Sequence, residues 1–260
     1  MGILVAVTGK GGVGKTAVTA LIVKCLVKRY GDRKNILVID ADPDANLPDA
    51  LGVNVDVRNT IGYIANEFKK SIARGELPPS ADKGAILESR VLEAVVELDK
   101  YDLLVMWRTE GEGCYCFVNE VLSKALDWLM DGYDIVVMDC EAGLEHFNRR
   151  VFKSVDHLLI VVDGSKQSFD TAERIKSIVQ EVGIKVDNMW IIANKIPENC
   201  IDIVRERCKR VSIPLLGVLP IDSQVFEYYI KGLPVYNLPD NNPCVKAIGE
   251  MLDKIGLLAL

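Results

Sequence analysis

The stretch GKGGVGKT, residues 9–16, decides the fold of this chain. It fits the phosphate-loop pattern G-x-x-x-x-G-K-[ST] at every fixed position. An apolar run, Ile3–Thr8, precedes the loop, and a helix-like stretch, Thr16–Arg29, follows it directly. A strand, a glycine-rich turn and a helix in this order gather backbone N–H groups and the amino end of a helix around one anion. The sequence therefore predicts a P-loop.

The loop residues have separate expected roles. The glycines let successive N–H groups turn inward onto phosphate oxygens. We expect Lys15 to contact the β- and γ-phosphates of ATP, and the hydroxyl of Thr16 to hold Mg²⁺. Lys10 is an additional feature, because a lysine at the second loop position cannot easily reach the γ-phosphate of its own subunit. The expected nucleotide-binding residues of this segment are Gly9, Lys10, Gly11, Gly12, Val13, Gly14, Lys15, Thr16 and Ala17.

Short apolar runs alternate with helix-like stretches along the rest of the chain. Most runs are continuous Val, Ile and Leu, which is typical of parallel strands covered on both faces. The alternation predicts an α/β fold with a doubly wound, mainly parallel seven-stranded sheet and helices on both faces. The expected strands are Ile3–Thr8, Ile36–Asp40, Leu103–Trp107, Ile135–Asp139, Leu158–Val162, Trp190–Asn194 and Leu215–Leu219. The expected helices are Thr16–Arg29, Phe117–Met130, Ser168–Val182 and a stretch around Asn199–Arg210.

One stretch interrupts this alternation. Residues 56–100 separate the second and third strands by more than a normal crossover. We expect a single domain over residues 1–260, with a helical insertion at about 56–100 that holds helices near Thr60–Ala73 and Ala85–Leu98. Such an insertion serves either a partner surface or extra layers of packing, and the sequence leaves both open.

Composition excludes several classes of protein. Apolar residues make up 49% of the 260 residues and charged residues 26%, which is typical of a globular chain. The formal net charge of −6 argues against a nucleic-acid partner. No apolar run approaches the roughly 18 residues of a membrane span, and the first residues lack the basic start of a signal peptide. Seven cysteines, an odd number, do not suit a disulfide framework. We therefore expect a cytoplasmic protein without a membrane or nucleic-acid partner.

Carboxylates follow two of the predicted strands. Asp40 and Asp42 lie at the end of the second strand, and Asp139 ends the fourth. Ligand groups in open α/β sheets gather at the carboxyl ends of strands, so we expect all three beside the phosphates. Asp139 resembles a Walker B carboxylate that anchors Mg²⁺, and Asp40 is expected to support the same ion through water. At the end of the sixth strand, Asn194 and Lys195 suit the edge and the face of an adenine ring.

The pair Cys114 and Cys116 stands apart from the scattered cysteines. One residue separates the two thiols, which is too close for an unstrained disulfide to be the default. Thiolates near the start of a helix have lowered pKa values and suit a soft ion such as Ni²⁺ or Zn²⁺. A closed tetrahedral site needs four ligands, and a symmetric homodimer would supply the other two. The alternative is a pair of free cysteines in a tight turn.

The loop K-G-G-V-G-K-T resembles the deviant Walker A motif of the P-loop ATPases that include MinD, ParA and the nitrogenase iron protein. The resemblance implies a homodimer that sandwiches ATP, with Lys10 reaching the nucleotide of the other subunit. It also implies that Asp42 orients or activates the attacking water, which makes Lys10, Lys15 and Asp42 the expected catalytic residues. Pro220 and Asp222, after the last strand, look like the family's other adenine wall.

The whole chain resembles the CooC-type carbon monoxide dehydrogenase accessory ATPases. The resemblance rests on residues 9–16, on G-E-G-C-Y-C at 111–116 and on residues 139–146. It implies a metallochaperone that assists nickel insertion into carbon monoxide dehydrogenase or the related acetyl-CoA synthase, with an intersubunit metal site at the cysteine pair. Two other functions stay open: a positioning ATPase of the MinD or ParA kind, and an iron–sulfur reductase driven by ATP. The residues carried over are Lys10, Lys15, Thr16, Asp42, Asp139, Cys114 and Cys116.

Overall fold

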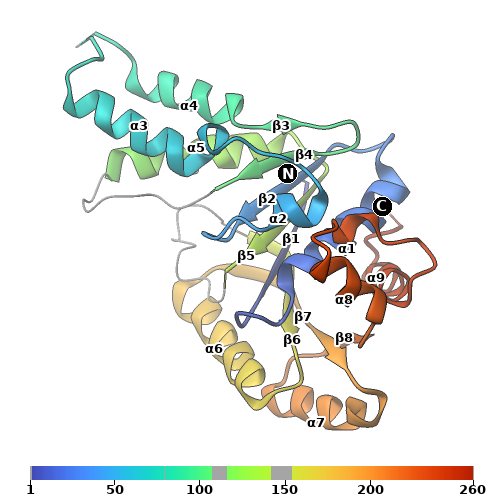
Figure 1. The fold of residues 1–260 in the computed structure, drawn as a ribbon. Coiled ribbons are helices and arrows are strands. Elements are labelled where there is room, and N and C mark those ends of the chain that lie inside the picture. The colour runs from blue at the N-terminus through green and yellow to red at the C-terminus, as the bar shows by residue number, and fades with distance from the viewer. Residues whose placement is uncertain (1, 79, 107–115, 142–153, 260) are drawn as a thin grey trace.

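The computed structural model describes residues 2–78, 80–106, 116–141 and 154–259 (Figure 1). Its centre is one twisted sheet, which has eight strands within the described residues, in the order β3-β4-β2-β5-β1-β6-β7-β8. All neighbouring pairs are parallel except β3 with β4. The strands are β1 (Ile3–Gly9), β2 (Ile36–Ala41), β3 (Val96–Glu97), β4 (Asp102–Val105), β5 (Ile135–Cys140), β6 (Ser154–Val162), β7 (Lys185–Ile196) and β8 (Leu215–Pro220).

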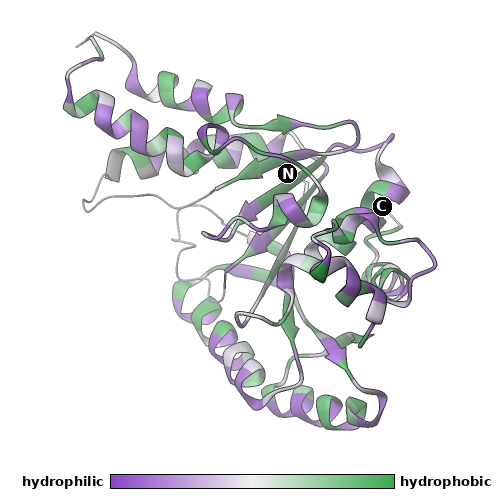
Figure 2. Cartoon of the chain, in the orientation of Figure 1, coloured by the Kyte–Doolittle hydropathy of each residue, from purple (hydrophilic) through white to green (hydrophobic). Residues whose placement is uncertain are grey.

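Helices cover both faces of the sheet, which confirms the predicted fold class. One buried cluster joins the sheet to α3 through α7, and a second joins its other face to α1, α2 and α9. The central strands are mainly hydrophobic, whereas the helices carry both kinds of side chain (Figure 2). The helices are α1 (Lys15–Tyr30), α2 (Leu47–Leu51), α3 (Ile61–Ala73), α4 (Lys83–Glu93), α5 (Cys116–Asp131), α6 (Lys166–Val182), α7 (Ile201–Val211), α8 (Ser223–Ile230) and α9 (Pro243–Lys254).

The strand count differs from the prediction because β3 replaces the end of a predicted helix. The expected helix Ala85–Leu98 stops at Glu93, and Val96–Glu97 pairs antiparallel with β4. Val95 and Val96 continue the apolar pattern of α4, but β-branched residues also favour a strand. Pairing with the exposed edge of β4 decides between the two.

The insertion adds packing to the sheet. Thr60 and Asp82 cap α3 and α4, because their side chains accept hydrogen bonds from N–H groups of the first turns. Phe68, Leu87 and Val91 are completely buried in the same cluster as the sheet. The predicted helix near Thr60–Ala73 is therefore confirmed, and both helices act as a further layer on this face.

The two outer strands of the sheet differ in length and surroundings. On one side β3 has only two residues. On the other side the ammonium group of Lys254 lies 3.5 Å from the carbonyl oxygen of Leu216 in β8. None of the helices in the described residues combines the length and the apolar composition needed to cross a bilayer.

Candidate nucleotide site

The P-loop occupies the turn between β1 and α1, as the sequence predicts. Gly14 has φ 93° and forms the amino cap of α1, while Val13 is completely buried and anchors the loop in the core. A Cβ atom at Gly14 would lie 2.5 Å from the Nδ2 atom of Asn194, and one at Gly9 would lie 2.3 Å from the Val161 carbonyl oxygen. These two glycines are required by both conformation and space.

Asn194, in β7, holds the P-loop in place through a hydrogen bond, which we call the Asn194 clamp. Its side chain is 8% exposed, and its Nδ2 group donates a hydrogen bond of 2.8 Å to the carbonyl oxygen of Val13. The sequence predicts only an adenine contact for Asn194, so the clamp was missed. The signal available was its place at the carboxyl end of a strand on the same edge of the sheet. Lys195 follows with a left-handed backbone, φ 58°.

Asp139 is the most deeply placed carboxylate of the site. Its Oδ1 atom accepts a hydrogen bond of 3.2 Å from the hydroxyl of Thr19, and Thr16 is close enough to lower the pKa of the same side chain. Its Oδ2 atom is buried without a hydrogen-bond partner among the described residues. Burial raises the pKa of Asp139 to about 6, against the opposing effects of Thr16 and Lys15.

This arrangement fits a magnesium ion. A buried carboxylate oxygen without a partner, next to a hydroxyl at the start of a helix, provides the hard oxygen ligands that Mg²⁺ prefers. Lys15, which is 7% exposed, lies in the same first turn as Thr16. Thr16 and Asp139 are therefore the residues that would hold the ion.

Asp40 has a different position from the one expected. Its side chain is completely buried, and its two oxygens accept hydrogen bonds from the backbone N–H groups of Asp42, at 3.1 Å, and Leu47, at 2.9 Å. Burial, and then the neighbouring charge of Asp139, raise the pKa of Asp40 to about 7. Asp40 thus anchors the turn of residues 42–47. Its expected support of Mg²⁺ through water stays a prediction, as does the role of Asp42, which is half-buried beside it.

Two threonines that the sequence analysis did not single out connect the parts of the site. Thr19 lies one turn after Thr16, and its hydroxyl also donates to the carbonyl oxygen of Lys15 at 3.0 Å. Thr8 is completely buried at the end of β1 and donates a hydrogen bond of 3.0 Å to the carbonyl oxygen of Glu141. These bonds fix the P-loop relative to the carboxyl end of β5.

The residues predicted at the adenine edge have structural roles in this fold. Asp222 caps α8, because its Oδ1 atom accepts a hydrogen bond of 2.9 Å from the N–H group of Val225. The same atom accepts a hydrogen bond of 3.2 Å from the Nδ2 group of Asn242, at the start of α9. Pro220 ends β8 beside Ile196 of β7. Contact of Pro220 and Asp222 with adenine stays a prediction.

The predicted thiolate metal site lies outside the described residues. Cys114 belongs to the segment 107–115, and of Cys116 only the backbone at the start of α5 is described. In the part of the chain that is described, no three His, Cys, Asp or Glu side chains come together to hold a metal ion. Cys140 is completely buried, and burial raises its pKa well above the usual value. It is therefore a core thiol.

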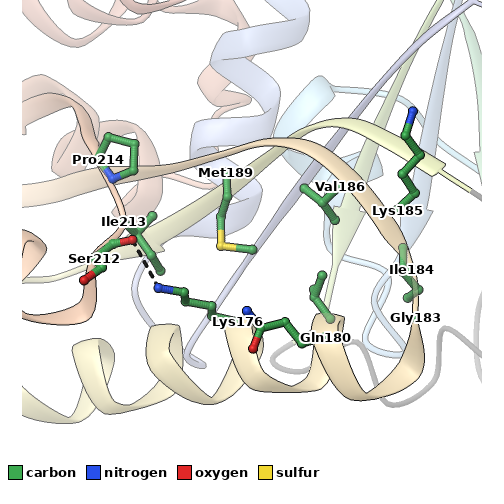
Figure 3. A pocket seen from close by; sticks show the side chains of 11 residues that line it. Lys176, Gln180, Gly183, Ile184, Lys185, Val186, Met189, Ser212, Ile213 and Pro214 are labelled. Atoms are coloured by element: carbon green, nitrogen blue, oxygen red, sulfur yellow. Dashed lines mark hydrogen bonds between the residues drawn. The ribbon is translucent and has the colours of Figure 1, made fainter.

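Lys10 is half-buried at the start of the loop, and its carbonyl oxygen accepts a hydrogen bond of 3.4 Å from the N–H group of Val13. A hollow of about 430 Å³ lies elsewhere, at the opposite edge of the sheet (Figure 3). It is formed by the end of α6 and the starts of β7 and β8, and none of the predicted site residues lines it.

Residues 4–235 match the CobQ/CobB/MinD/ParA nucleotide binding domain. The chain belongs to this family. It is accordingly a nucleotide-binding ATPase, which converts ATP and water to ADP and phosphate. The match spans the P-loop, the three aspartates and the strand that carries Asn194.

Similar proteins agree with this assignment. The chain is 44% identical to an uncharacterized ATP-binding protein of Methanocaldococcus jannaschii, over 97% of this chain and 98% of that protein. It is 32% identical to the carbon monoxide dehydrogenase accessory protein CooC of Rhodospirillum rubrum, over 90% of this chain and 89% of that protein. MinD in the MinC:MinD cell division protein complex of Aquifex aeolicus has a similar fold, with TM-score 0.69, 22% identity, and coverage of 97% and 95%.

Proposed function

We propose that this ATPase is a metallochaperone that assists nickel insertion into carbon monoxide dehydrogenase or the related acetyl-CoA synthase. The observation that carries the proposal is the coincidence of two features in one chain. The P-loop site has a buried carboxylate, Asp139, with an oxygen that has no hydrogen-bond partner among the described residues. The sequence also contains Cys114 shortly before α5 and Cys116 as the first residue of α5. The similarity to a carbon monoxide dehydrogenase accessory protein over most of both chains supports the client.

Hydrolysis uses the described residues as follows. Lys15 and the loop N–H groups bind the β- and γ-phosphates, and Asn194 holds the loop in shape through Val13. Asp42 orients the water that attacks the γ-phosphorus, and the bond to the β–γ bridging oxygen breaks to leave ADP. Magnesium, when held by Thr16 and Asp139, offsets the negative charge of the phosphates.

A second copy of the chain completes this site in our proposal. Lys10 lies at the rim of the loop and is only half-buried, so its ammonium group is available to an adjoining subunit. ATP between two subunits closes the homodimer, and hydrolysis reopens it. The cysteine pair of each subunit then contributes two thiolates to one Ni²⁺ or Zn²⁺ ion, which is the cargo. Closing and opening the dimer changes the geometry of that intersubunit site.

Metal analysis and sizing, with and without Mg-ATP, test the cargo site. We expect the Cys114→Ser/Cys116→Ser variant to lose bound nickel or zinc while it keeps ATP binding. Cys200→Ser is the matched control, because Cys200 is a partly exposed free thiol on another element, and its Sγ atom donates a hydrogen bond to Asn199. Unchanged metal content in the double variant would contradict the thiolate site. Purified protein with the visible absorbance of an iron–sulfur cluster would indicate the reductase instead.

The action of Lys10 across the interface has its own test. Specific ATPase activity of the wild type should rise with protein concentration, since two copies form each site. The Lys10→Ala variant should still bind ATP, but its specific ATPase activity should be about 100-fold or more below that of the wild type at every protein concentration. Activity of this variant that equals the wild type would refute the role in the partner's site.

A positioning ATPase is the second candidate, favoured by the likeness to MinD in fold. That function requires attachment to a membrane or to DNA. Co-sedimentation with anionic liposomes and with plasmid DNA, with and without Mg-ATP, discriminates between the two. The nickel-insertion proposal predicts no ATP-dependent pelleting with either.

A further inference from the structure

The turn of residues 42–47, which joins β2 to α2, is anchored at both of its ends by the carboxylate of Asp40. The Oδ1 atom accepts a hydrogen bond of 3.1 Å from the N–H group of Asp42, and the Oδ2 atom accepts one of 2.9 Å from the N–H group of Leu47. Asp40 is completely buried, and its carbonyl oxygen accepts a hydrogen bond of 2.8 Å from the N–H group of Met106. The anchor is therefore itself fixed in the sheet.

The bond to Leu47 replaces a cap that the sequence next to α2 does not provide. Asn46, at the N-cap position, has an αR backbone, and its side chain makes no capping hydrogen bond. Asp40 therefore satisfies an N–H group at the start of α2 from the end of β2. Leu47 and Leu51 are buried in the same cluster as α1, against which α2 packs. The anchor thus connects the turn to the helix that follows the P-loop.

The turn itself is strained. Ala45 has φ 48°, in the left-handed region where a Cβ atom crowds the following carbonyl oxygen. Its N–H group donates a hydrogen bond of 3.0 Å to the carbonyl oxygen of Asp42, and the Oδ1 atom of Asp42 accepts one of 3.0 Å from the N–H group of Asp44. Strained backbone persists only where the surrounding bonds over-determine it. The two bonds to Asp40 supply this constraint.

These bonds determine where the carboxylate of Asp42 lies. Asp42 is half-buried, and its charge is close enough to raise the pKa values of both Asp40 and Asp139. Asp40 and Asp139 are themselves register partners in the neighbouring strands β2 and β5. A misplacement of about 1 Å in a group that orients a reactant can cost about 100-fold in rate. A small movement of this turn would therefore slow hydrolysis without removing any group of the P-loop.

We infer that Asp40 is a positioning residue for ATP hydrolysis, which holds the turn of residues 42–47 so that Asp42 can orient the attacking water. The inference rests on the role of Asp42 in the proposed function and adds a residue that acts through it. It also differs from support of Mg²⁺ through water. A positioning role depends on the two backbone hydrogen bonds, whereas an ion-supporting role depends on a place beside the ion.

Steady-state kinetics of Asp40→Asn tests the positioning role. The Nδ2 group of asparagine cannot accept a hydrogen bond, so one of the two N–H groups loses its partner. We expect kcat to fall by at least about 10-fold, while the Kd for Mg-ATP stays within about threefold of the wild type. The Mg²⁺ concentration for half-maximal activity should also stay within about threefold. An unchanged kcat, or a larger shift in the Mg²⁺ requirement, overturns the inference.

Asp156→Asn is the matched control. The Oδ2 atom of Asp156 also accepts a backbone hydrogen bond, of 2.8 Å from the N–H group of Leu4, but at the end of β1 opposite to the P-loop. This variant should leave kcat unchanged. Asp139 raises the pKa of Asp40, and an uncharged asparagine avoids this repulsion, so we expect Asp40→Asn to fold. An equal fall of kcat in both variants would show that general destabilisation, and not position, lowers the rate.

Substitutions of Ala45 change the strain of the turn without removing the buried carboxylate. Glycine adopts the left-handed conformation without strain, so Asp40→Asn/Ala45→Gly should recover about three- to fivefold of the lost kcat. Ala45→Val, with a β-branched side chain, should lower kcat while calorimetry still finds one ATP bound per chain. Failure of the double variant to recover, or a wild-type kcat for Ala45→Val, would contradict the inference.

Asp42→Ala separates this inference from the proposed function. The substitution should lower kcat by about 100-fold, and Asp40→Asn should then add no further loss, because Asp40 acts through Asp42. A wild-type rate for Asp42→Ala would contradict the role of Asp42 in the proposed function, and the inference with it. Slow hydrolysis by Asp42→Ala beside a normal kcat for Asp40→Asn would contradict the inference alone. Additive losses in the double variant would also overturn it, since Asp40 would then act by another route.

Discussion

The carboxyl ends and the amino ends of the parallel strands form two opposite edges of the central sheet, called here the carboxyl edge and the amino edge. These two edges differ in the groups that they bury. At the carboxyl edge, Asp40 and Asp139 are completely buried, their pKa values are raised, and one carboxylate oxygen has no hydrogen-bond partner in the described part of the chain. At the amino edge, a hollow of about 430 Å³ is open, but Lys176 beside it already donates to the carbonyl oxygens of Val211 and Ser212. In this fold, buried groups without partners therefore locate a site better than empty volume does.

The direction of the strands and helices explains this difference. The amino end of α1 meets the carboxyl edge, and its N–H groups and dipole favour an anion there. The carboxyl ends of α6 and α7 meet the amino edge, where free carbonyl groups favour cations such as Lys176. A phosphate is therefore stabilised at the first edge and repelled by carbonyl groups at the second.

A matched pair of lysine substitutions tests the comparison most strongly. Lys15→Met should lower the rate of phosphate release by at least about 100-fold, because it removes a fixed positive charge from the phosphates. Lys185→Met removes a lysine that lines the hollow and should leave the rate within about twofold. Steady-state ATPase assays measure both. Equal losses from the two variants would show that the hollow is part of the active site.

Stability at different pH values tests the cost of the buried carboxylate. The pKa of Asp139 is about 6 in the folded state and 3.8 ordinarily. The contribution of this carboxyl group to the free energy of unfolding is therefore fully present below about pH 4 and is lost as the pH rises through 6. At pH 8 without nucleotide, Asp139→Asn should therefore raise the free energy of unfolding by about 2–3 kcal/mol.

The same variant should show a flatter dependence of stability on pH between 4 and 8, and it should lose the effect of Mg²⁺ on nucleotide affinity. Chemical denaturation at several pH values, with calorimetry for binding, measures both. An Asn variant that is less stable than the wild type at pH 8 would contradict the raised pKa.

A double-mutant cycle tests the Asn194 clamp. Gly14→Ala should weaken ATP binding for two reasons. Alanine is strained in the left-handed backbone conformation of this position, and its Cβ atom would lie only 2.5 Å from the Nδ2 atom of Asn194. Asn194→Ala alone should weaken ATP binding by about 10-fold, because the bond to Val13 is lost. In the double variant the clash with Asn194 disappears, so the loss of ATP-binding free energy should be smaller than the sum of the losses in the two single variants. Purely additive losses would show that the clamp and Gly14 do not interact.

The smallest effect is expected at the amino edge. Ser212 ends α7 with φ 54°, a left-handed conformation that glycine adopts without strain. Ser212→Gly should raise the free energy of unfolding by about 0.5–1 kcal/mol and leave ATP turnover unchanged. Thermal denaturation and the ATPase assay provide the two readings, and a fall in turnover would connect this edge to catalysis.

The sequence predicts the fold and the centre of the site because both depend on local patterns. The P-loop and the carboxylate of Asp139 are marked by the strands that carry them. The contacts that shape the site join residues far apart in the chain, such as Asn194 to Val13 and Thr8 to Glu141. No local pattern marks such pairs. The same limit explains β3, which forms only because β4 lies beside it.

The outer strands of the sheet affect how the protein behaves at high concentration. A long, flat strand with unpaired backbone groups at the edge of a sheet is a template for amyloid growth. Here one edge strand is two residues long, and at the other edge a lysine lies on the carbonyl group of Leu216. Strand addition at the β3 edge therefore has little backbone to pair with, and in the described residues the more exposed template is β8, where Lys254 covers a single carbonyl group.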